Sequence, residues 1–508
     1  MLVALSACVA SDPGAPAEPA GDLSDRGGIG VNESAVTTPT VTIDPRRSLA
    51  VTDVALQSQF TLDAVLNQLA AQSPPGVTGL DLFHQLWDTQ NPAASGVTSV
   101  RHCDAEGNTL NSFPYSCRTE GAMATSPMSL FSIVGVYNRF DLADPGGFDC
   151  GEYRMVFARN DGRRAFIIFE AVLPNSSDRF DGVFGCRPVE NFWAQLTSVA
   201  DPATRASMLR NFFFQGLPGF GPVISINNYG GFGSFRQGQV RVNQFVQPPW
   251  ELHEFKLLRS TTANVPVKFV PSTVKVNPFG DLFRDGGSHP RTAAFQQFFP
   301  SQVQKLALND INRFDMAMSD TFNAGESNVD ATGNYTALFA SGTGVFAGAI
   351  QTQLTRIGST LTPANIVARA QALSCAGCHQ LSNGADLGGG ITWPASAGFV
   401  HSTEFQETGP DGPRFRISPA LTNVFLPNRA NILSTFLSRT RCIPGSTRCD
   451  FACGFGNGAS SDDCIVKCSP DGSTWQPFEN CGWAQNGTSS ASCQDSATSP
   501  PQATCLLF

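Results

Sequence analysis

The chain has 508 residues, of which 41% are hydrophobic and 15% charged, with a formal net charge of −9 and a pI near 5.2. This length is sufficient for two or three domains with their own cores. The acidic balance argues against nucleic acids and anionic membranes as partners, because both attract clustered Lys and Arg. No run of apolar residues approaches the 18 or so needed for a membrane-spanning helix.

The first residues resemble a bacterial lipoprotein signal. Leu5-Ser6-Ala7-Cys8 matches the lipobox, in which a peptidase cuts before the Cys and the thiol then carries lipid. Residues 1–8 are therefore interpreted as a partial lipoprotein signal. They lack the positively charged region and the full apolar core of a signal peptide. Either the start of the sequence is placed too far downstream, or the match to the lipobox is accidental. Residues 9–45 are rich in Pro, Ala, Gly, Ser and Thr, which predicts a flexible tether.

Residues 46–360 predict one large α+β domain of unknown role, with a mainly antiparallel sheet and flanking helices. Leu62, Val65, Leu66 and Leu69 recur at helical spacing behind Thr61, which predicts a helix over 61–72. Further helices are expected at 80–89, 202–213, 293–315 and 346–356. β-Branched and aromatic runs between turn residues predict strands at 130–137, 153–158, 165–173, 239–246 and 265–270.

This large domain contains no recognisable catalytic motif. His253-Glu254 lacks the second His of a zinc protease motif, and no phosphate-binding or nucleophile-elbow pattern is present. Glu170 shares a predicted strand face with Phe166 and Ile168, so it is expected to be buried. A buried carboxylate is either a general base or a partner in a structural ion pair with Arg154 or Arg139, and the ion pair is more common.

The cysteines indicate an oxidising compartment. Cys103 with Cys117, and Cys150 with Cys186, are predicted to form two local disulfides. Eight further Cys lie in residues 442–508, which have little apolar content, so this segment is predicted to be a disulfide-rich module with four bridges. Eight cysteines allow 105 pairings, and the sequence does not choose among them. Disulfides of this number favour an extracytoplasmic location.

Residues 361–441 carry the most specific motif of the chain. Thr362-Pro363 begins a predicted helix that ends at Leu373, and Cys375, Cys378 and His379 follow in the spacing C-x-x-C-H. Random placement of 15 Cys and 6 His in this chain yields only about 0.005 such patterns. A Gly-rich loop comes next, and a closing helix is predicted over 428–439. The alternatives for the two thiols are a short-loop disulfide and half of a zinc site.

The early helix, the C-x-x-C-H motif and the late helix occur in the order found in class I cytochromes c, and residues 361–441 resemble that family. The resemblance implies a small all-α domain with one covalent haem c. Cys375 and Cys378 would form the thioethers, and His379 would be the proximal iron ligand. The whole chain also resembles uncharacterised secreted or lipoprotein sequences of Gram-negative bacteria that carry one C-x-x-C-H.

The second axial ligand departs from the family pattern. Cytochromes of this class use a Met after the motif, whereas every Met of this chain precedes it. His401 is therefore predicted to be the second iron ligand. An open distal position, or Met316 or Met318 reaching in from the large domain, are the alternatives. Arg414 and Arg416 are candidates for pairing with haem propionates or for a solvated strand face. Trp393 is a candidate to pack on the porphyrin edge or in a core.

These features together predict an extracytoplasmic monohaem c-type cytochrome that exchanges electrons with an unknown redox partner protein. Its only membrane contact would be a lipid anchor, with the outer membrane or cell surface as the expected site; otherwise the protein would be periplasmic or secreted. One alternative is a redox enzyme whose large domain is catalytic and whose haem relays electrons. The other is a surface binding lipoprotein. Because no catalytic motif lies outside the haem site, an electron carrier is preferred.

Overall fold

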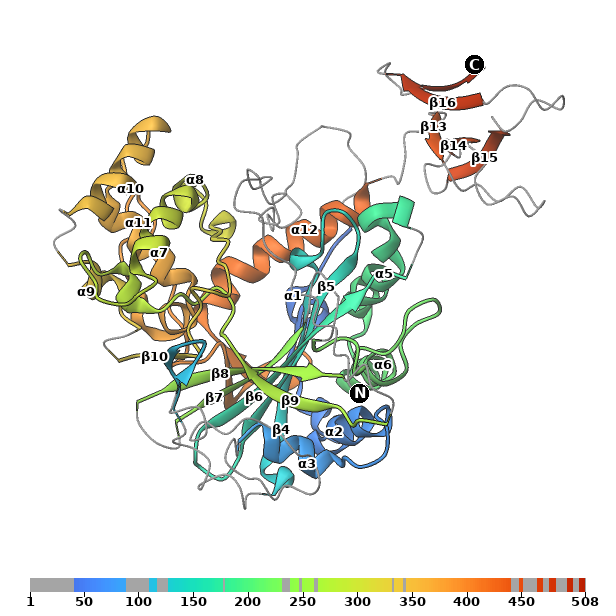
Figure 1. Ribbon diagram of the computed structural model, residues 1–508. Helices are drawn as coiled ribbons and strands as arrows, with labels where there is room; N and C mark the ends of the chain where they lie inside the picture. Colours follow the sequence, from blue (N-terminus) through green and yellow to red (C-terminus); the bar gives the residue numbers. More distant parts are fainter. Residues whose placement is uncertain are drawn as a thin grey trace, which may run out of the picture.

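The computed structural model describes residues 41–87, 109–116, 127–176, 179–230, 238–245, 249–259, 264–330, 333–340 and 344–439, and five strands between 447 and 507 (Figure 1). The predicted signal, most of the predicted tether, Cys103 and Cys117 lie outside these residues. No helix in the described part of the chain combines the length and apolar character needed to cross a bilayer.

A large antiparallel sheet forms the centre of the molecule, as the sequence predicts. Its strands follow one another in the order β1 (Ala50–Val51), β4 (Phe131–Arg139), β5 (Asp149–Arg159), β6 (Ala165–Pro174), β7 (Gln239–Gln244), β8 (Glu251–Leu258) and β10 (Glu326–Asn328). β9 (Lys268–Ser272) also pairs with β8. The sequence analysis missed β8, because its many charged residues interrupt the apolar pattern on which strand prediction depends.

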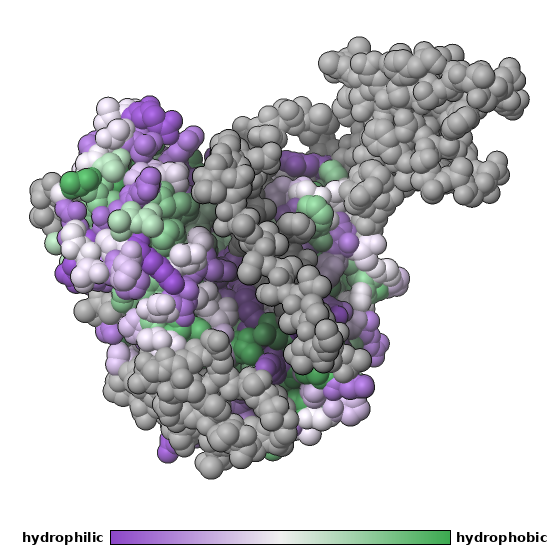
Figure 2. Space-filling view, viewed as in Figure 1, coloured by the Kyte–Doolittle hydropathy of each residue, from purple (hydrophilic) through white to green (hydrophobic). Residues whose placement is uncertain are grey.

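The helices lie in two groups around this sheet (Figure 1). One group contains α2 (Leu62–Ala71), α3 (Gly79–Gln85), α5 (Arg187–Gln195) and α6 (Pro202–Gln215). The other, near β10, contains α7 (Thr292–Phe298), α8 (Val303–Leu306), α9 (Tyr335–Phe339), α10 (Val345–Arg356) and α11 (Pro363–Leu373). α1 (Pro45–Ser48) and α12 (Leu426–Ser438) complete the described helices. Figure 2 shows this face of the molecule hollowed between the two groups, with hydrophilic residues visible in the hollow.

Most predicted helices begin where the sequence places them. The Thr61 side chain accepts a hydrogen bond from the backbone N–H of Ala64 at 3.1 Å and so caps α2. The single helix predicted over 293–315 is wrong. Pro300 has no N–H to donate, and the segment is divided into α7, a 3₁₀ turn over Phe299–Gln302 and the short α8.

One face of the sheet is apolar and packs against the first group of helices. Tyr153 on β5 stacks on Trp193 of α5, with ring centroids 5.8 Å apart, and contacts Phe212 of α6 edge to face at 5.3 Å. All three side chains are fully buried. Aromatic packing of this kind supplies much of the stability of the main core.

The opposite face of the sheet carries buried carboxylates and half-buried guanidinium groups at alternate strand positions. These residues are Arg139, Glu152, Arg154, Glu170, Arg241 and Glu254. Glu170 is 1% exposed and lies 3.1 Å from Arg154 and 3.4 Å from Arg241. The predicted ion pair between Glu170 and Arg154 is therefore present, within a network that continues across four strands.

Residues 361–441 differ from the predicted small all-α unit. α11 and α12 lie where the sequence predicts helices, but an antiparallel hairpin, β11 (Ser402–Gly409) and β12 (Gly412–Ile417), stands between them. α11 packs into the core of the second helix group, whereas α12 packs into the main core, where Phe436 contacts Phe140. The two helices thus belong to two different cores because their apolar faces meet different neighbours. The C-x-x-C-H segment between them is embedded in the larger fold.

One of the predicted local disulfides is present, between Cys150 and Cys186. In the C-terminal segment, β13 (Thr447–Asp450), β14 (Cys464–Cys468) and β15 (Trp475–Asn480) form one antiparallel sheet, and β16 (Ala491–Ser496) pairs with β17 (Gln502–Leu507). The cysteine side chains of this segment lie outside the described part, so the four predicted bridges stay a prediction.

Candidate functional site

The C-x-x-C-H motif lies directly after α11, in a tight turn that continues as a π-helical segment over Gly377–Leu381. Ser374 closes the turn: its Oγ accepts from the backbone N–H of Gly377 at 3.0 Å, and its carbonyl accepts from Cys378 at 2.8 Å. A Cβ at position 377 would stand 1.6 Å from the carbonyl oxygen of Gln371, so only glycine fits there.

The start of the motif is held against the edge of the large sheet. The backbone N–H of Cys375 donates to Asn277 Oδ1 at 3.3 Å, and that of Ala376 donates to Ser327 Oγ on β10 at 3.0 Å. Cys375 also packs with Trp250 and with Leu252 of β8 in a small buried cluster. These two hydrogen bonds are made by backbone N–H groups, so they fix the position of the turn without using the thiol of Cys375.

The two motif cysteines are unpaired thiols. Cys375 is buried, Cys378 is half-buried, and no disulfide joins them. Burial raises the pKa of Cys375 to about 11 and that of Cys378 to about 12, because a thiolate is poorly solvated there. The short-loop disulfide considered from the sequence is therefore absent from the structure, and both thiols are protonated at neutral pH.

His379 is oriented by a hydrogen bond and by stacking. Its Nδ1–H donates to the carbonyl oxygen of Phe399 at 2.6 Å, and its ring stacks on Trp250 with centroids 5.5 Å apart. Since a carbonyl only accepts, Nδ1 carries the proton and Nε2 keeps its lone pair. Burial lowers the pKa of His379 to about 4, so the ring is neutral at physiological pH. A neutral imidazole with a fixed tautomer is the form that binds a metal.

Asn243 on β7 connects the two groups that orient His379. Its Oδ1 accepts from Nε1 of Trp250, and its Nδ2 donates to the carbonyl oxygen of Phe399 at 3.3 Å. Asn243 is 1% exposed. The orientation of His379 thus depends on residues that lie more than 100 positions away in the sequence, which the motif alone does not reveal.

His401 lies beside the motif. Its Nε2 is 3.2 Å from Cys378 Sγ, and its Nδ1 is 2.8 Å from Ser418 Oγ. The rings of His401 and His379 have centroids 4.9 Å apart. Burial, followed by the charge of His379, lowers the pKa of His401 well below its usual value. The structure therefore gathers the four residues that the sequence selects in one partly buried place: Cys375, Cys378, His379 and His401.

The methionine and arginine candidates lie elsewhere. Met316 is buried in the core of the second helix group, and Met318 packs against the same core. Arg414 on β12 pairs with Glu407 at 2.8 Å, and Arg416 is exposed and bonds the carbonyl of Gln406. These contacts fit the interpretation that the two arginines lie on a solvated face of the strand.

Trp393 is buried near the motif. It packs with Leu387 and Phe425 in a cluster that Cys378 also contacts. Its indole Nε1 has no hydrogen-bond partner among the described residues. The indoles of Trp87 and Trp193 in the main core are in the same state, so Trp393 fits the interpretation of a core residue.

The buried arginines of the sheet face were missed as site residues. Arg241 and Arg154 lower the pKa of His379 through their charges, after the larger effect of burial. Arg429 on α12 lies 3.4 Å from Asp141, and burial lowers its pKa to about 9. Alternating charged residues in β5 and β7 were the available signal, but only the folded sheet brings them toward the motif.

No family model, curated protein or solved structure matches this chain. The site must therefore be interpreted from its own donor set. Two protonated thiols, an oriented neutral imidazole, a second imidazole, aromatic packing and nearby guanidinium groups form a donor set that could hold a covalently attached haem. A tetrahedral zinc site would use the same thiols and imidazoles but gives no role to the arginines.

Proposed function

We propose that this protein is an extracytoplasmic c-type cytochrome that transfers electrons through one haem attached to Cys375 and Cys378. The observation that carries the proposal is the hydrogen bond from His379 Nδ1 to the carbonyl of Phe399, which leaves Nε2 available beside two unpaired thiols. A backbone carbonyl that fixes a ligating histidine in this way is common in metal sites.

Each residue of the site has a defined part in this proposal. Cys375 and Cys378 would hold the haem by addition of S–H across its two vinyl groups, with no leaving group. His379, through Nε2, and His401 would be the side chains that bind its iron. A bound haem supplies a one-electron couple, and two imidazole ligands hold its potential lower than a Met ligand would.

The charged sheet face suits the propionates of a haem. Arg429 is buried, pairs with Asp141 at 3.4 Å and has a depressed pKa, so an added carboxylate nearby would stabilise its charged form. This proposal replaces Arg414 and Arg416 as propionate partners. It also gives a reason for the concentration of guanidinium groups on the face of the sheet that is turned toward the motif.

The proposed location rests on the disulfide and on haem attachment. The Cys150–Cys186 bridge favours an oxidising compartment, and bacteria attach haem c after export. A lipid anchor on Cys8 remains part of this proposal, with the outer membrane or cell surface as its site.

The test is to mature the full chain with the haem-attachment machinery and to measure its mass and its reduced-minus-oxidised absorption spectrum. We expect the mass of one haem and a sharp α-band. Cys375→Ser with Cys378→Ser should abolish covalent haem, and His379→Ala should abolish stable incorporation. His84→Ala, a histidine on α3, is the matched control and should keep both signals. A colourless protein of polypeptide mass, or one that holds zinc at these thiols, would overturn the proposal.

A redox enzyme is the second candidate, with the haem as an electron relay. The observation that favours it is a group of metal-ligating side chains in the large domain, formed by Glu251, His253 and Glu326. Reduction of the haem by an added substrate would support the enzyme, whereas a reversible one-electron couple without substrate turnover supports the electron carrier.

A further inference from the structure

Two carboxylates and an imidazole meet where β8 pairs with β10. Glu326 stands opposite His253 in the antiparallel register, and Asn328 stands opposite Glu251. One ligand atom from each of Glu251, His253 and Glu326 lies within 4.8 Å of those of the other two. Glu251 is fully buried, and the side chains of His253 and Glu326 are only 8% and 9% exposed.

We propose that Glu251, His253 and Glu326 form a binding site for a divalent first-row transition-metal ion. Carboxylate oxygens and an imidazole nitrogen together suit Mn²⁺, Fe²⁺ and Zn²⁺. The proposed electron carrier uses none of these residues, and His253-Glu254 lacks the second His of a helical zinc motif. The ligands here come instead from paired strands.

The surrounding residues hold the three ligands in place. Gln244 donates from Nε2 to Glu251 Oε1, and Asn328 donates to Glu326 Oε1 at 3.0 Å. The backbone N–H of Ser116 donates to Glu326 Oε2 at 2.5 Å. Tyr115 stacks on the His253 ring with centroids 4.5 Å apart. Metal ligands in proteins are usually supported by such a second layer of hydrogen bonds.

The competing interpretation is a structural ion pair. His253 Nε2 is 3.4 Å from Glu326 Oε2, so a protonated His253 would pair with this carboxylate. A divalent ion would instead bind the ligand atoms of both carboxylates and of a neutral His253, all of which lie within 4.8 Å of one another. Metal loading of the purified chain distinguishes the two occupants.

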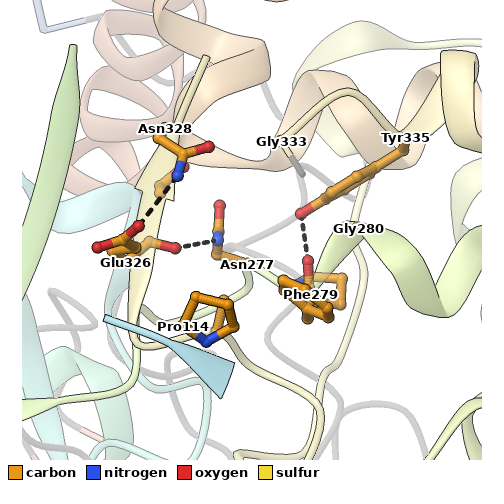
Figure 3. A pocket seen from close by; sticks show the side chains of 11 residues that line it. Pro114, Asn277, Phe279, Gly280, Glu326, Asn328, Gly333 and Tyr335 are labelled. Carbon is orange, nitrogen blue, oxygen red and sulfur yellow. Dashed lines mark hydrogen bonds between the residues drawn. The ribbon is translucent and has the colours of Figure 1, made fainter. Parts of the chain in front are cut away.

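One of the three proposed ligands also lines a small pocket. Glu326 and Asn328 line it together with Pro114, Asn277 and Tyr335 (Figure 3). Figure 3 shows Glu326 and Asn328 joined by their hydrogen bond at one side of this pocket. Of the three proposed ligands, Glu326 is therefore the one that borders this pocket.

The proposed cation site and the haem motif lie on opposite faces of the β8–β10 ladder. Leu252 and Ser327 contact Cys375 and Ala376, while their strand neighbours Glu251, His253 and Glu326 point to the other face. The two sites share a strand pair but no side chain, so they can be tested separately.

The experiment uses the full chain, stripped with a chelator and then equilibrated with Mn²⁺ alone. Mn²⁺ is chosen because thiolates bind it poorly, which excludes the terminal cysteines. Elemental analysis and electron paramagnetic resonance should show one bound ion per chain. His253→Ala and the shape-preserving Glu326→Gln should each lose it, and His289→Ala, a histidine that stacks on Phe113, should keep it.

Each outcome decides the proposal. Wild-type protein that binds no Mn²⁺ under these conditions, or Glu326→Gln that binds as tightly as wild type, would overturn it and leave the ion pair. Circular dichroism of each variant checks folding. The double change Cys375→Ser with Cys378→Ser should leave Mn²⁺ binding intact, so failure of the haem proposal would not affect this result.

Discussion

The carbonyl oxygen of Phe399 accepts hydrogen bonds from both His379 Nδ1, at 2.6 Å, and Asn243 Nδ2, at 3.3 Å. The bond from His379 determines which nitrogen of the imidazole ring keeps its lone pair. Asn243 also accepts a hydrogen bond from Trp250, on which the His379 ring stacks. A strand of the large sheet therefore controls the orientation of the motif histidine. The haem motif and the large domain are consequently one structural unit.

Asn243→Leu should lower the free energy of unfolding by about 1–3 kcal/mol, because it leaves the buried Nε1–H of Trp250 without its partner. Denaturant unfolding of the haem-free protein measures this. Asn160→Ala is the control, since that side chain is exposed and bonds only Ser132 in the described structure. Equal losses in both variants would show that Asn243 has no special role.

His401→Ala should change the spectrum of the haem-loaded protein from six-coordinate low-spin to high-spin, because the second imidazole would be lost. Ser418→Ala removes only the hydrogen bond at His401 Nδ1 and should leave the protein low-spin, with a smaller shift. Absorption and resonance Raman spectra report both states. An unchanged spectrum in His401→Ala would exclude this residue as a ligand.

Glu170→Ala should lower the free energy of unfolding by about 3–5 kcal/mol, because it removes a buried carboxylate and leaves the half-buried Arg154 and Arg241 with one partner fewer each. The spectrum of the haem should not change. Arg284→Ala removes an exposed pair with Asp281 and should cost less than about 1 kcal/mol. A loss of haem without a loss of stability in Glu170→Ala would instead assign Glu170 a role at the site.

Stability should fall as the pH rises from 4.5 toward 8 because of Glu190. Burial raises the pKa of this carboxyl to about 8, although Tyr153 and Asn138 donate hydrogen bonds to it. At a pH between the pKa of Glu190 in the unfolded chain and its pKa in the folded protein, the carboxyl is ionised only in the unfolded chain. Over this range the free energy of unfolding therefore falls by up to about 1.4 kcal/mol per pH unit.

Glu190→Gln keeps the shape and removes the ionisation. It should flatten the dependence of Tm on pH between 4.5 and 8, and raise Tm at pH 8 relative to wild type. Thermal scans at several pH values measure this difference. Parallel pH curves for the two proteins would contradict the assignment to Glu190.

Cys150→Ser with Cys186→Ser should lower the free energy of unfolding by about 2–5 kcal/mol, because the bridge closes a loop over a separation of 36 residues. Reduction of the wild-type protein should lower its Tm similarly, and reduction of the double variant should not. A double variant as stable as wild type would show that packing around these positions is sufficient.

Several elements follow from local sequence alone. Thr61 with the apolar spacing of Leu62, Val65 and Leu66 predicts α2, and the structure places the helix there because the cap and the periodicity act within one or two turns. The burial of Glu170 follows from strand alternation in the same way. β8 was missed because its charged residues do not read as a buried strand, although Glu254 pairs with Arg241 of β7 as well as with Lys256 of β8.

The sequence by itself determined the thiol and imidazole donors, because C-x-x-C-H sets their separation through a few covalent bonds. Only the tertiary structure decided that Asn243, Trp250 and Phe399 orient His379, that Arg429 faces the site in place of Arg414, and that Glu326 meets His253. These contacts join segments far apart in the chain. They exist because antiparallel pairing and the burial of apolar helix faces bring the segments together, and no local pattern records that geometry.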